Sequence, residues 1–400
     1  MVTLDKIYHA AFVLRDITRR TDLIAAPTLV DGLDLHLKTE NLQVTGSFKV
    51  RGASYMISKL DDEQKAAGII TCSAGNHAQG VAMAATAAGV KSVVCMPDGA
   101  PIMKVENTKR LGAEVRLVPG TYDDAHDYAE ELAAKTGMTF VHPYDDEDVI
   151  AGQGTIGLEI LDQLDDVDAV VVPVGGGGLI SGVACAIKNL KPSCAVYGVQ
   201  AEGAASMERA WVAGERQSLK NVSTFADGIA VKTPGEITFG MVQKYVDKVV
   251  TVTDDEVAAA ILALIERQKV IAEGAGAVSV AAAMFGKLPL EGKRVVCVVS
   301  GGNIDVNILS RVIARGLAMS GRTVELGIAL TDKPGQLELV SRLIAECGAN
   351  VVSVDYDRTD PNLPISSCIL RIGMETRDRE QIELIKERLA AEGFELVSER

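Results

Sequence analysis

The sequence predicts an α/β fold over most of its length and a small unit of mixed strands and helices at its C-terminus. From about residue 68 to residue 299, short apolar runs alternate with longer stretches of helical character. This alternation is typical of crossover units, which build mostly parallel sheets with both faces covered. Hydrophobic residues make up 48% of the chain but aromatic residues only 4%, so the core must consist of Ala, Val, Ile and Leu. Such a core suits tightly packed α/β layers.

The expected strands and helices of the α/β region follow one another regularly. Strands are expected over residues 68–72, 92–96, 114–118, 169–174, 195–200 and 294–299. Helices are expected over residues 78–88, 101–111 and 122–136. Because a helix follows each of the first three strands, these strands are expected to lie parallel to one another.

The pattern changes after about Arg322. Strands are expected over residues 324–330, 351–356, 366–372 and 394–397, and helices over residues 334–348 and 379–391. The resulting order, βαββαβ, is that of ferredoxin-like folds. We therefore expect a first region over residues 1–318, a linker over residues 319–322 and a separate C-terminal domain over residues 323–400.

Composition argues against several classes of function. The formal net charge is −14, and nucleic-acid binding needs a basic surface. The seven cysteines form no CxxC pair and the five histidines are not spaced as ligands, so we expect reduced thiols, a cytoplasmic location and no metal site. Residues 169–187 carry no charge, but Pro173 and four consecutive glycines interrupt them. A strand, a loop and a buried helix are therefore expected there instead of a membrane span.

One lysine, Lys49, stands at the start of an expected helix in the segment 47–53, which reads SFKVRGA. An amine that attacks an aldehyde must be neutral, so its pKa must be lowered by burial or by nearby positive charge. Phe48 precedes this lysine and Arg51 follows it closely. Taken alone, however, a solvated lysine on a helix surface is the simpler interpretation.

Two loops have the composition of anion-binding sites. Residues 73–77, SAGNH, follow an expected strand and open a helix, where free backbone N–H groups bind anions. Residues 175–179, GGGGL, lie between a strand and a helix, and glycines let backbone N–H groups converge on a phosphate. An ordinary helix cap and a tight glycine turn are the simpler alternatives. A nucleoside-triphosphate loop is disfavoured because no GxxxxGK[ST] motif is present.

A fourth segment, residues 300–303, reads SGGN and directly follows an apolar strand. Alone it could be a serine that forms a turn. In this order, the four segments together resemble the serine/threonine dehydratase family of pyridoxal-phosphate enzymes. The resemblance covers about residues 5–318 and implies a two-domain catalytic unit of fold type II, similar to the β subunit of tryptophan synthase. It also implies that residues 45–148 form a smaller subdomain inserted in the larger one.

The resemblance further implies pyridoxal 5'-phosphate as the cofactor and a role for each motif. Lys49 would form the Schiff base with the cofactor and would move the proton of the substrate's α-carbon. Phe48 would pack on the pyridine ring, Asn76 would hydrogen-bond the ring hydroxyl and Ser300 would face the ring nitrogen. The residues implied in cofactor binding are Phe48, Lys49, Asn76, Gly175, Gly176, Gly177, Gly178, Leu179 and Ser300. Those implied in holding the substrate carboxylate are Ser73, Ala74, Gly75, Asn76 and His77.

Two acidic residues are weaker candidates. Glu273 precedes Gly274 and either faces the site or is simply a carboxylate at a helix N-terminus. Asp227 and Gly228 are expected to line the pocket through their backbone.

The C-terminal domain carries a second resemblance. Residues 331–337, TDKPGQL, and 347–351, CGANV, resemble the ACT domain, a small-molecule sensor common on enzymes of amino-acid metabolism. Pro334 suits a first helical position, and Gly335 leaves room for a ligand or a neighbouring subunit. The resemblance implies an amino-acid effector and a homodimer or homotetramer. A purely structural dimerisation module is the alternative.

From both resemblances we expect a lyase that converts L-threonine to 2-oxobutanoate and ammonia, with a side activity on L-serine that gives pyruvate. A neutral serine at the ring nitrogen favours elimination over transamination. Serine racemases of the wider family carry a second serine where this chain has Ala74, so racemisation is disfavoured. Two alternatives stay open. One is another enzyme of the same fold, such as a racemase or a β-replacement enzyme, and the other is a non-catalytic amino-acid sensor.

Overall fold

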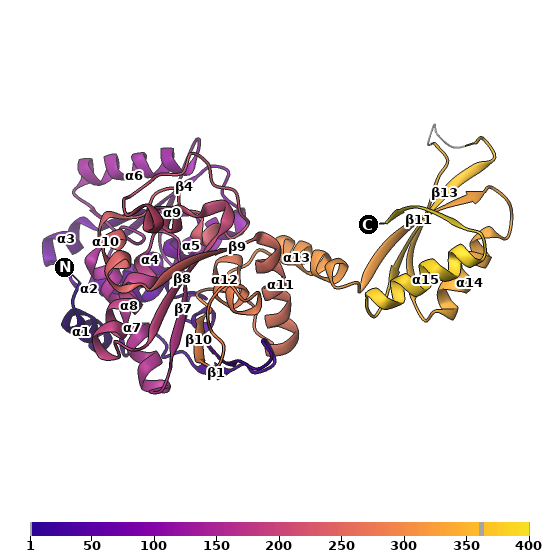
Figure 1. Cartoon of the computed structure of the whole chain (residues 1–400). Coiled ribbons are helices and arrows are strands. Elements are labelled where there is room, and N and C mark those ends of the chain that lie inside the picture. The colour runs from indigo at the N-terminus through magenta and orange to yellow at the C-terminus, as the bar shows by residue number, and fades with distance from the viewer. Residues whose placement is uncertain (1, 360–363, 400) are drawn as a thin grey trace. The chain divides into compact units, whose positions relative to one another are not determined.

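The computed structural model describes residues 2–359 and 364–399. Residue contacts divide the chain into two compact units, Met1–Asp305 and Val306–Arg400. The first unit contains a six-stranded and a four-stranded sheet, and the second contains one four-stranded sheet (Figure 1).

The larger sheet of the first unit has the strand order β1-β2-β10-β7-β8-β9. Its strands are β1 (Leu23–Ala25), β2 (Asp34–Lys38), β7 (Ala169–Pro173), β8 (Ala195–Ala201), β9 (Lys248–Val252) and β10 (Arg294–Val298). Strand β1 pairs antiparallel with β2, and the other pairs are parallel, which confirms the mostly parallel sheet that the sequence predicts. All five residues of β7 are buried, as in a strand covered on both faces.

Helices cover the two faces of this sheet. Helices α7 (Glu147–Gln163) and α8 (Gly178–Leu190) pack together on one face, and α12 (Gly274–Met284) contacts β7, β8 and β10 from the other (Figure 1). The other helices packed around this sheet are α1 (Leu4–Leu14), α9 (Ser206–Ala213), α10 (Glu236–Tyr245) and α11 (Asp254–Ala263). Branched aliphatic residues of the central strands, Val170, Val172, Val296 and Val298, form the core between the layers.

The smaller sheet has four parallel strands in the order β5-β4-β3-β6. Its strands are β3 (Ile69–Cys72), β4 (Ser92–Pro97), β5 (Glu114–Val118) and β6 (Thr139–Phe140). The neighbouring helices are α2 (Lys49–Ser58), α3 (Asp62–Ala67), α4 (Asn76–Ala87), α5 (Ile102–Arg110) and α6 (Tyr122–Thr136). All these strands lie within residues 45–148, the range expected for an inserted subdomain. Its boundaries stay a prediction.

Helix α4 begins at Asn76, two residues before the predicted start at residue 78. The sequence pattern was too coarse here, because a helix start depends on which backbone groups find partners. Asn76 and His77 therefore belong to the first turn, whose backbone N–H groups have no partner within the helix.

The second unit starts with helix α13 (Val306–Met319) and continues as an antiparallel sheet of order β12-β13-β11-β14. Its other elements are β11 (Thr323–Thr331), α14 (Gln336–Glu346), β12 (Asn350–Asp357), β13 (Ser367–Glu375), α15 (Arg379–Ala391) and β14 (Glu395–Glu399). Their order confirms the predicted βαββαβ pattern. Residues of the sheet, such as Ile328 and Leu370, form a core with Val340 and Ile385 of the two helices. The domain limits and the linker over residues 319–322 stay predictions, although α13 ends at Met319 and β11 begins at Thr323.

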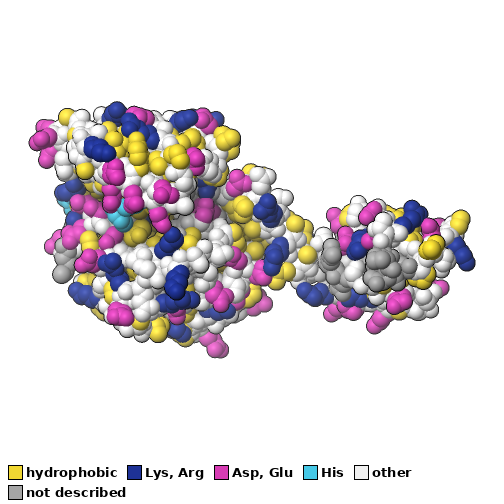
Figure 2. Space-filling view, turned by 90° about the horizontal axis from the view of Figure 1, so that it is seen from above, with side chains coloured by type: hydrophobic (Ala, Val, Ile, Leu, Met, Phe, Trp, Pro, Cys, Tyr) yellow, Lys and Arg dark blue, Asp and Glu magenta, His cyan; other side chains and the backbone are white. Residues whose placement is uncertain are grey.

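Within residues 2–359 and 364–399, no helix is long and apolar enough to cross a membrane. Over the same residues, no group of three or more His, Cys, Asp or Glu side chains is arranged to hold a metal ion. All seven cysteines are free. On the face shown in Figure 2, acidic and basic side chains are interspersed over the first unit.

Candidate functional site

Lys49 is the first residue of α2, and the segment before it is anchored to the loop that follows β10. The backbone N–H of Phe48 donates to the Ser300 carbonyl at 3.1 Å, and Ser47 forms a β-bridge with Gly301. Part of the Lys49 surface is accessible to solvent, but its Nζ lies inside and donates to the Pro143 carbonyl at 2.7 Å. Burial lowers the Lys49 pKa to about 8, against the opposing effect of the Glu273 charge. The lowered pKa increases the fraction of this amine that is neutral, the form that nucleophilic attack requires.

The glycine loop between β7 and α8 is shaped by close contacts with Tyr144. A Cβ atom at Gly176 would collide with the Tyr144 ring, and one at Gly178 would lie 2.8 Å from the Tyr144 carbonyl. Gly177 has a φ of +100°, a conformation that side chains disfavour, and it caps α8. The loop thus brings the N-terminus of α8, with its free backbone N–H groups, next to the segment that binds Lys49.

Glycine is needed throughout this loop, because protein atoms already occupy the space that a side chain at residues 176–178 would take. Backbone N–H groups are therefore what the loop could offer to an anion. The Thr238 hydroxyl donates to the Gly176 carbonyl at 2.6 Å and holds the loop in place. Leu179 is 5% exposed and packs in the core of the large sheet, so only its backbone could face a ligand.

Residues 73–77 connect β3 to α4 and leave open space. The Gly75 N–H donates to the Ser73 hydroxyl at 3.1 Å, and a Cβ atom at Gly75 would meet no atom within 4 Å. Ala74 packs against the apolar core beside α4. His77 is buried, its Nε2 lies 3.0 Å from the Val141 carbonyl, and burial lowers its pKa to about 3. The neutral His77 ring is thus turned into the protein, and the backbone of the first turn is what could bind a carboxylate.

Asn76 joins this loop to the loop that follows β10. Its Nδ2 donates to Glu273 Oε1 at 2.6 Å, and its Oδ1 accepts from Asn303 Nδ2 at 2.7 Å. Ser300 is 3% exposed, and its hydroxyl lies 3.4 Å from the Ala275 carbonyl at the start of α12. The structure therefore brings the lysine, the loops over residues 73–77 and 175–179 and the serine turn into one continuous region.

Glu273 stands at a helix N-terminus and also contacts another candidate residue, so its position is compatible with both interpretations of the sequence. It occupies the N-cap position of α12, yet its side chain makes no capping hydrogen bond and contacts Asn76 instead. Burial and the charge of Asp227 raise the Glu273 pKa to about 7. Asp227 itself pairs with Lys104 at 2.6 Å, while a Cβ atom at Gly228 would lie 3.6 Å from Glu273 Oε1.

Sequence reasoning missed four residues of this region. Pro143 and Tyr144 carry no motif, and Thr238 and Asn303 are ordinary polar residues until the fold brings them to the loops. The SGGN segment did include Asn303, but only as part of a turn.

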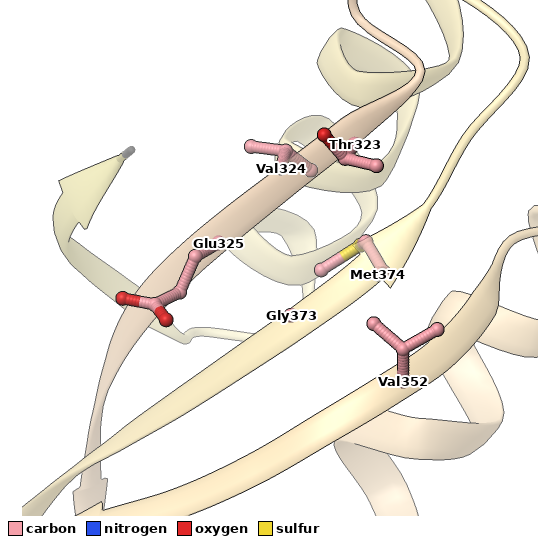
Figure 3. A pocket seen from close by; sticks show the side chains of 6 residues that line it. All are labelled: Thr323, Val324, Glu325, Val352, Gly373 and Met374. Atoms are coloured by element: carbon pink, nitrogen blue, oxygen red, sulfur yellow. The ribbon is translucent and has the colours of Figure 1, made fainter. Parts of the chain in front are cut away.

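A hollow lies on the sheet of the second unit. The residues that line it are Thr323, Val324, Glu325, Val352, Gly373 and Met374 (Figure 3). Glu325 is the one ionisable side chain among them, and the lining offers no nucleophile.

Comparison with known proteins identifies relatives of the chain. Residues 14–301 match the family described as pyridoxal-phosphate dependent enzymes. An L-threonine ammonia-lyase of Thermotoga maritima is 48% identical over 398 residues, which are 99% of this chain and 99% of that protein. A catabolic L-threonine dehydratase of Staphylococcus aureus is 48% identical over 323 residues, which are 79% of this chain and 93% of that protein.

Two solved structures resemble the same fold. Threonine deaminase isoform 2 from Solanum lycopersicum, in its processed form, has a TM-score of 0.74 and 40% identity, covering 78% of this chain and 88% of that one. Maize serine racemase has a TM-score of 0.75 and 34% identity, covering 80% of this chain and 98% of that one.

Proposed function

This chain belongs to the L-threonine ammonia-lyases among the pyridoxal-phosphate-dependent enzymes, and we propose that it converts L-threonine to 2-oxobutanoate and ammonia. The observation that carries the proposal is the position of Lys49. Its amine has a lowered pKa and lies against Pro143, next to the tyrosine on which the glycine loop packs. A reactive amine and a nearby glycine loop that opens a helix are the two features that the cofactor needs.

Pyridoxal phosphate, when bound, supplies an aldehyde and an electron-withdrawing ring that stabilises negative charge on the substrate's α-carbon. Residues 175–179 would hold its phosphate through backbone N–H groups, and Phe48 would pack on its ring. Asn76 would donate to the ring hydroxyl, and Ser300 would face the ring nitrogen.

Residues of the chain itself would carry out proton transfer and substrate binding. Lys49, neutral in part near pH 8, accepts the proton from the α-carbon. The backbone N–H groups of residues 73–77 orient the substrate carboxylate at the start of α4. Ser300 carries no charge and would leave the ring nitrogen unprotonated. The ring would then withdraw less electron density than a protonated ring, which favours loss of the β-hydroxyl over transamination.

We further propose that L-serine is a slower substrate and that racemisation is negligible. Serine lacks one methyl group, which an apolar pocket discriminates by only about 1–3 kcal/mol. The similarity to maize serine racemase favours racemisation as the second candidate. Against it stands Ala74, which offers no hydroxyl on the face opposite Lys49.

One experiment tests the substrate and the reaction together. Oxoacid formation from L-threonine and from L-serine is measured at steady state, and chiral chromatography of the serine reaction detects D-serine. We expect 2-oxobutanoate and pyruvate, with threonine preferred, and only traces of D-serine. No oxoacid from threonine would refute the lyase function, and D-serine formed as fast as pyruvate would favour the racemase.

The second unit is proposed to bind an amino-acid effector as an ACT domain, in a homodimer or homotetramer. It has its own core and its own sheet. The S. aureus relative matches only 79% of this chain while 93% of its own length is aligned, so about a fifth of this chain has no counterpart there. A threonine dehydratase without a counterpart for about a fifth of this chain supports the idea that a region of that size, such as the second unit, is not needed for the chemistry.

Truncation of the chain after Gly321 is expected to leave cofactor binding and catalysis intact and to abolish the response to an effector. Coupling between two sites typically amounts to about 1–3 kcal/mol, or roughly 5–150-fold in affinity. Threonine saturation curves of full-length and truncated protein are compared with and without each common amino acid, beginning with isoleucine and valine. If no common amino acid affects the full-length enzyme, the second unit is best interpreted as an assembly module. The molecular masses of the full-length and truncated proteins would then show whether the oligomer depends on it.

A further inference from the structure

Three polar side chains from distant parts of the sequence form a hydrogen-bonded series beside the catalytic lysine. Glu273 Oε1 accepts from Asn76 Nδ2 at 2.6 Å, and Asn76 Oδ1 accepts from Asn303 Nδ2 at 2.7 Å. Glu273 is only 6% exposed, and its charge is felt at Lys49. The series therefore lies inside the site and is not a surface feature.

The backbone determines the direction of this series. Asn303 Nδ2 donates to the Thr45 carbonyl at 2.8 Å as well as to Asn76 Oδ1. A backbone carbonyl can only accept, so the amide nitrogen of Asn303 must point to Thr45 and Asn76. Asn76 must then present its oxygen to Asn303 and its nitrogen to Glu273. A flipped Asn76 would set its NH₂ group against that of Asn303, whatever the protonation of Glu273.

Two glycines give these side chains their room. A Cβ atom at Gly46 would collide with the Asn303 side chain, and Gly46 has a φ of +72°. A Cβ atom at Gly301 would collide with Glu273 and would lie 3.2 Å from Asn76 Nδ2. The backbone thus approaches the series closely from both sides and leaves its members little freedom to rotate.

We propose that Glu273 and Asn303 are positioning residues that lock the Asn76 amide in one orientation, so that its second N–H donates to the ring hydroxyl of the cofactor. This inference rests on the proposed function, because it assigns the task to the cofactor's ring. Glu273 provides an acceptor for one N–H, and the other N–H of the same nitrogen is directed away from it. The orientation of the Asn76 amide would determine whether the ring hydroxyl keeps its proton. The electronic state of the cofactor depends on that proton.

The test compares variants that keep or remove the hydrogen-bond acceptor. Glu273→Ala and Asn303→Ala are expected to shift the absorption of the bound cofactor between its two ring-hydroxyl tautomers. Each should lower kcat by about tenfold, the size expected for one misplaced hydrogen bond, with a smaller change in KM. Glu273→Gln, whose side-chain oxygen still accepts from Asn76, is expected to keep the wild-type spectrum. Asn303→Asp sets an oxygen against the Thr45 carbonyl and should shift the spectrum as Asn303→Ala does.

The matched control is Glu256→Ala. Glu256 is a carboxylate in the first turn of α11, where it accepts from the Thr253 N–H at 2.8 Å, so its loss removes a helix cap away from the site. Its spectrum should match that of wild type. The proposal fails if Glu273→Ala and Asn303→Ala retain the wild-type spectrum and kcat, or if Glu273→Gln shifts the spectrum as far as Glu273→Ala. Wild-type protein without oxoacid formation would instead refute the proposed function, independently of these spectra.

Discussion

Replacement of Lys49 by Ala is expected to abolish turnover of L-threonine while leaving the fold intact. The amine would be lost both as the bond to the cofactor and as the base for the α-proton. Alanine is a good residue for the start of α2, and the one side-chain hydrogen bond lost is that to Pro143. Steady-state oxoacid formation gives the activity, and circular dichroism confirms the fold.

Lys59→Ala is the matched control for this variant. Lys59 directly follows the same helix as its C-cap residue and is exposed to solvent, so its removal should leave turnover unchanged. If Lys49→Ala kept as much as about a tenth of the activity, the loss would correspond to only about 1.4 kcal/mol. Loss of a residue that is both the catalytic base and the covalent anchor of the cofactor must cost much more than this. The proposed role of Lys49 would therefore be wrong.

The motifs of this chain could be predicted because each is local. The glycine loop follows one strand and opens one helix, so its position between β7 and α8 depends on neighbouring residues alone. The same holds for Lys49 at the start of α2 and for the strand and helix order of the second unit. Periodicity and turn residues carry this information directly.

The partners of the motifs could not be predicted, because they come together only in the folded chain. Asn76 and Glu273 are 197 residues apart, and Asn303 and Thr45 are 258 residues apart. Nothing in the sequence around Pro143 or Tyr144 marks them as neighbours of Lys49 and the glycine loop. In the sequence, these residues resemble any other loop residue. Only the packing of the two sheets in the folded chain brings them close to one another.

Arg51 is another residue whose partners in the folded chain could not be predicted from the sequence. In the sequence it is a charge two residues after Lys49, whereas in the structure it is 1% exposed and lies between two carboxylates. Glu40 accepts from its Nε and Nη2 at 2.8 Å each, and Glu159 accepts from its Nη1 and Nη2 at 2.5 and 3.0 Å. Lys38, which is fully buried, pairs with Glu159 at 2.6 Å and completes a network with two positive and two negative charges.

Arg51→Met is expected to destabilise the first unit by about 3–5 kcal/mol, because it leaves buried carboxylates without their partner. Although burial raises the Glu40 pKa, the Arg51 charge and hydrogen bonds hold it below its ordinary value, and the variant loses that compensation. Urea unfolding of the cofactor-bound protein, followed by tryptophan fluorescence, measures the change. Arg116→Met is the control, since Arg116 forms a partly exposed ion pair with Glu114 that is worth about 0–1 kcal/mol.

The double variant Arg51→Met with Glu40→Met separates the pair's own contribution from the penalty for an unpaired charge. Removing both partners of a buried ion pair often costs far less than removing one, so part of the lost stability should return. Arg51→Lys keeps the charge but cannot form the two-pronged contact with Glu40, and it should fall between wild type and Arg51→Met. An Arg51→Met protein as stable as Arg116→Met would mean that water reaches Glu40 once the guanidinium is gone. In that case the network would not hold the start of α2, and the position of Lys49 would have to depend on the Phe48 and Pro143 contacts alone.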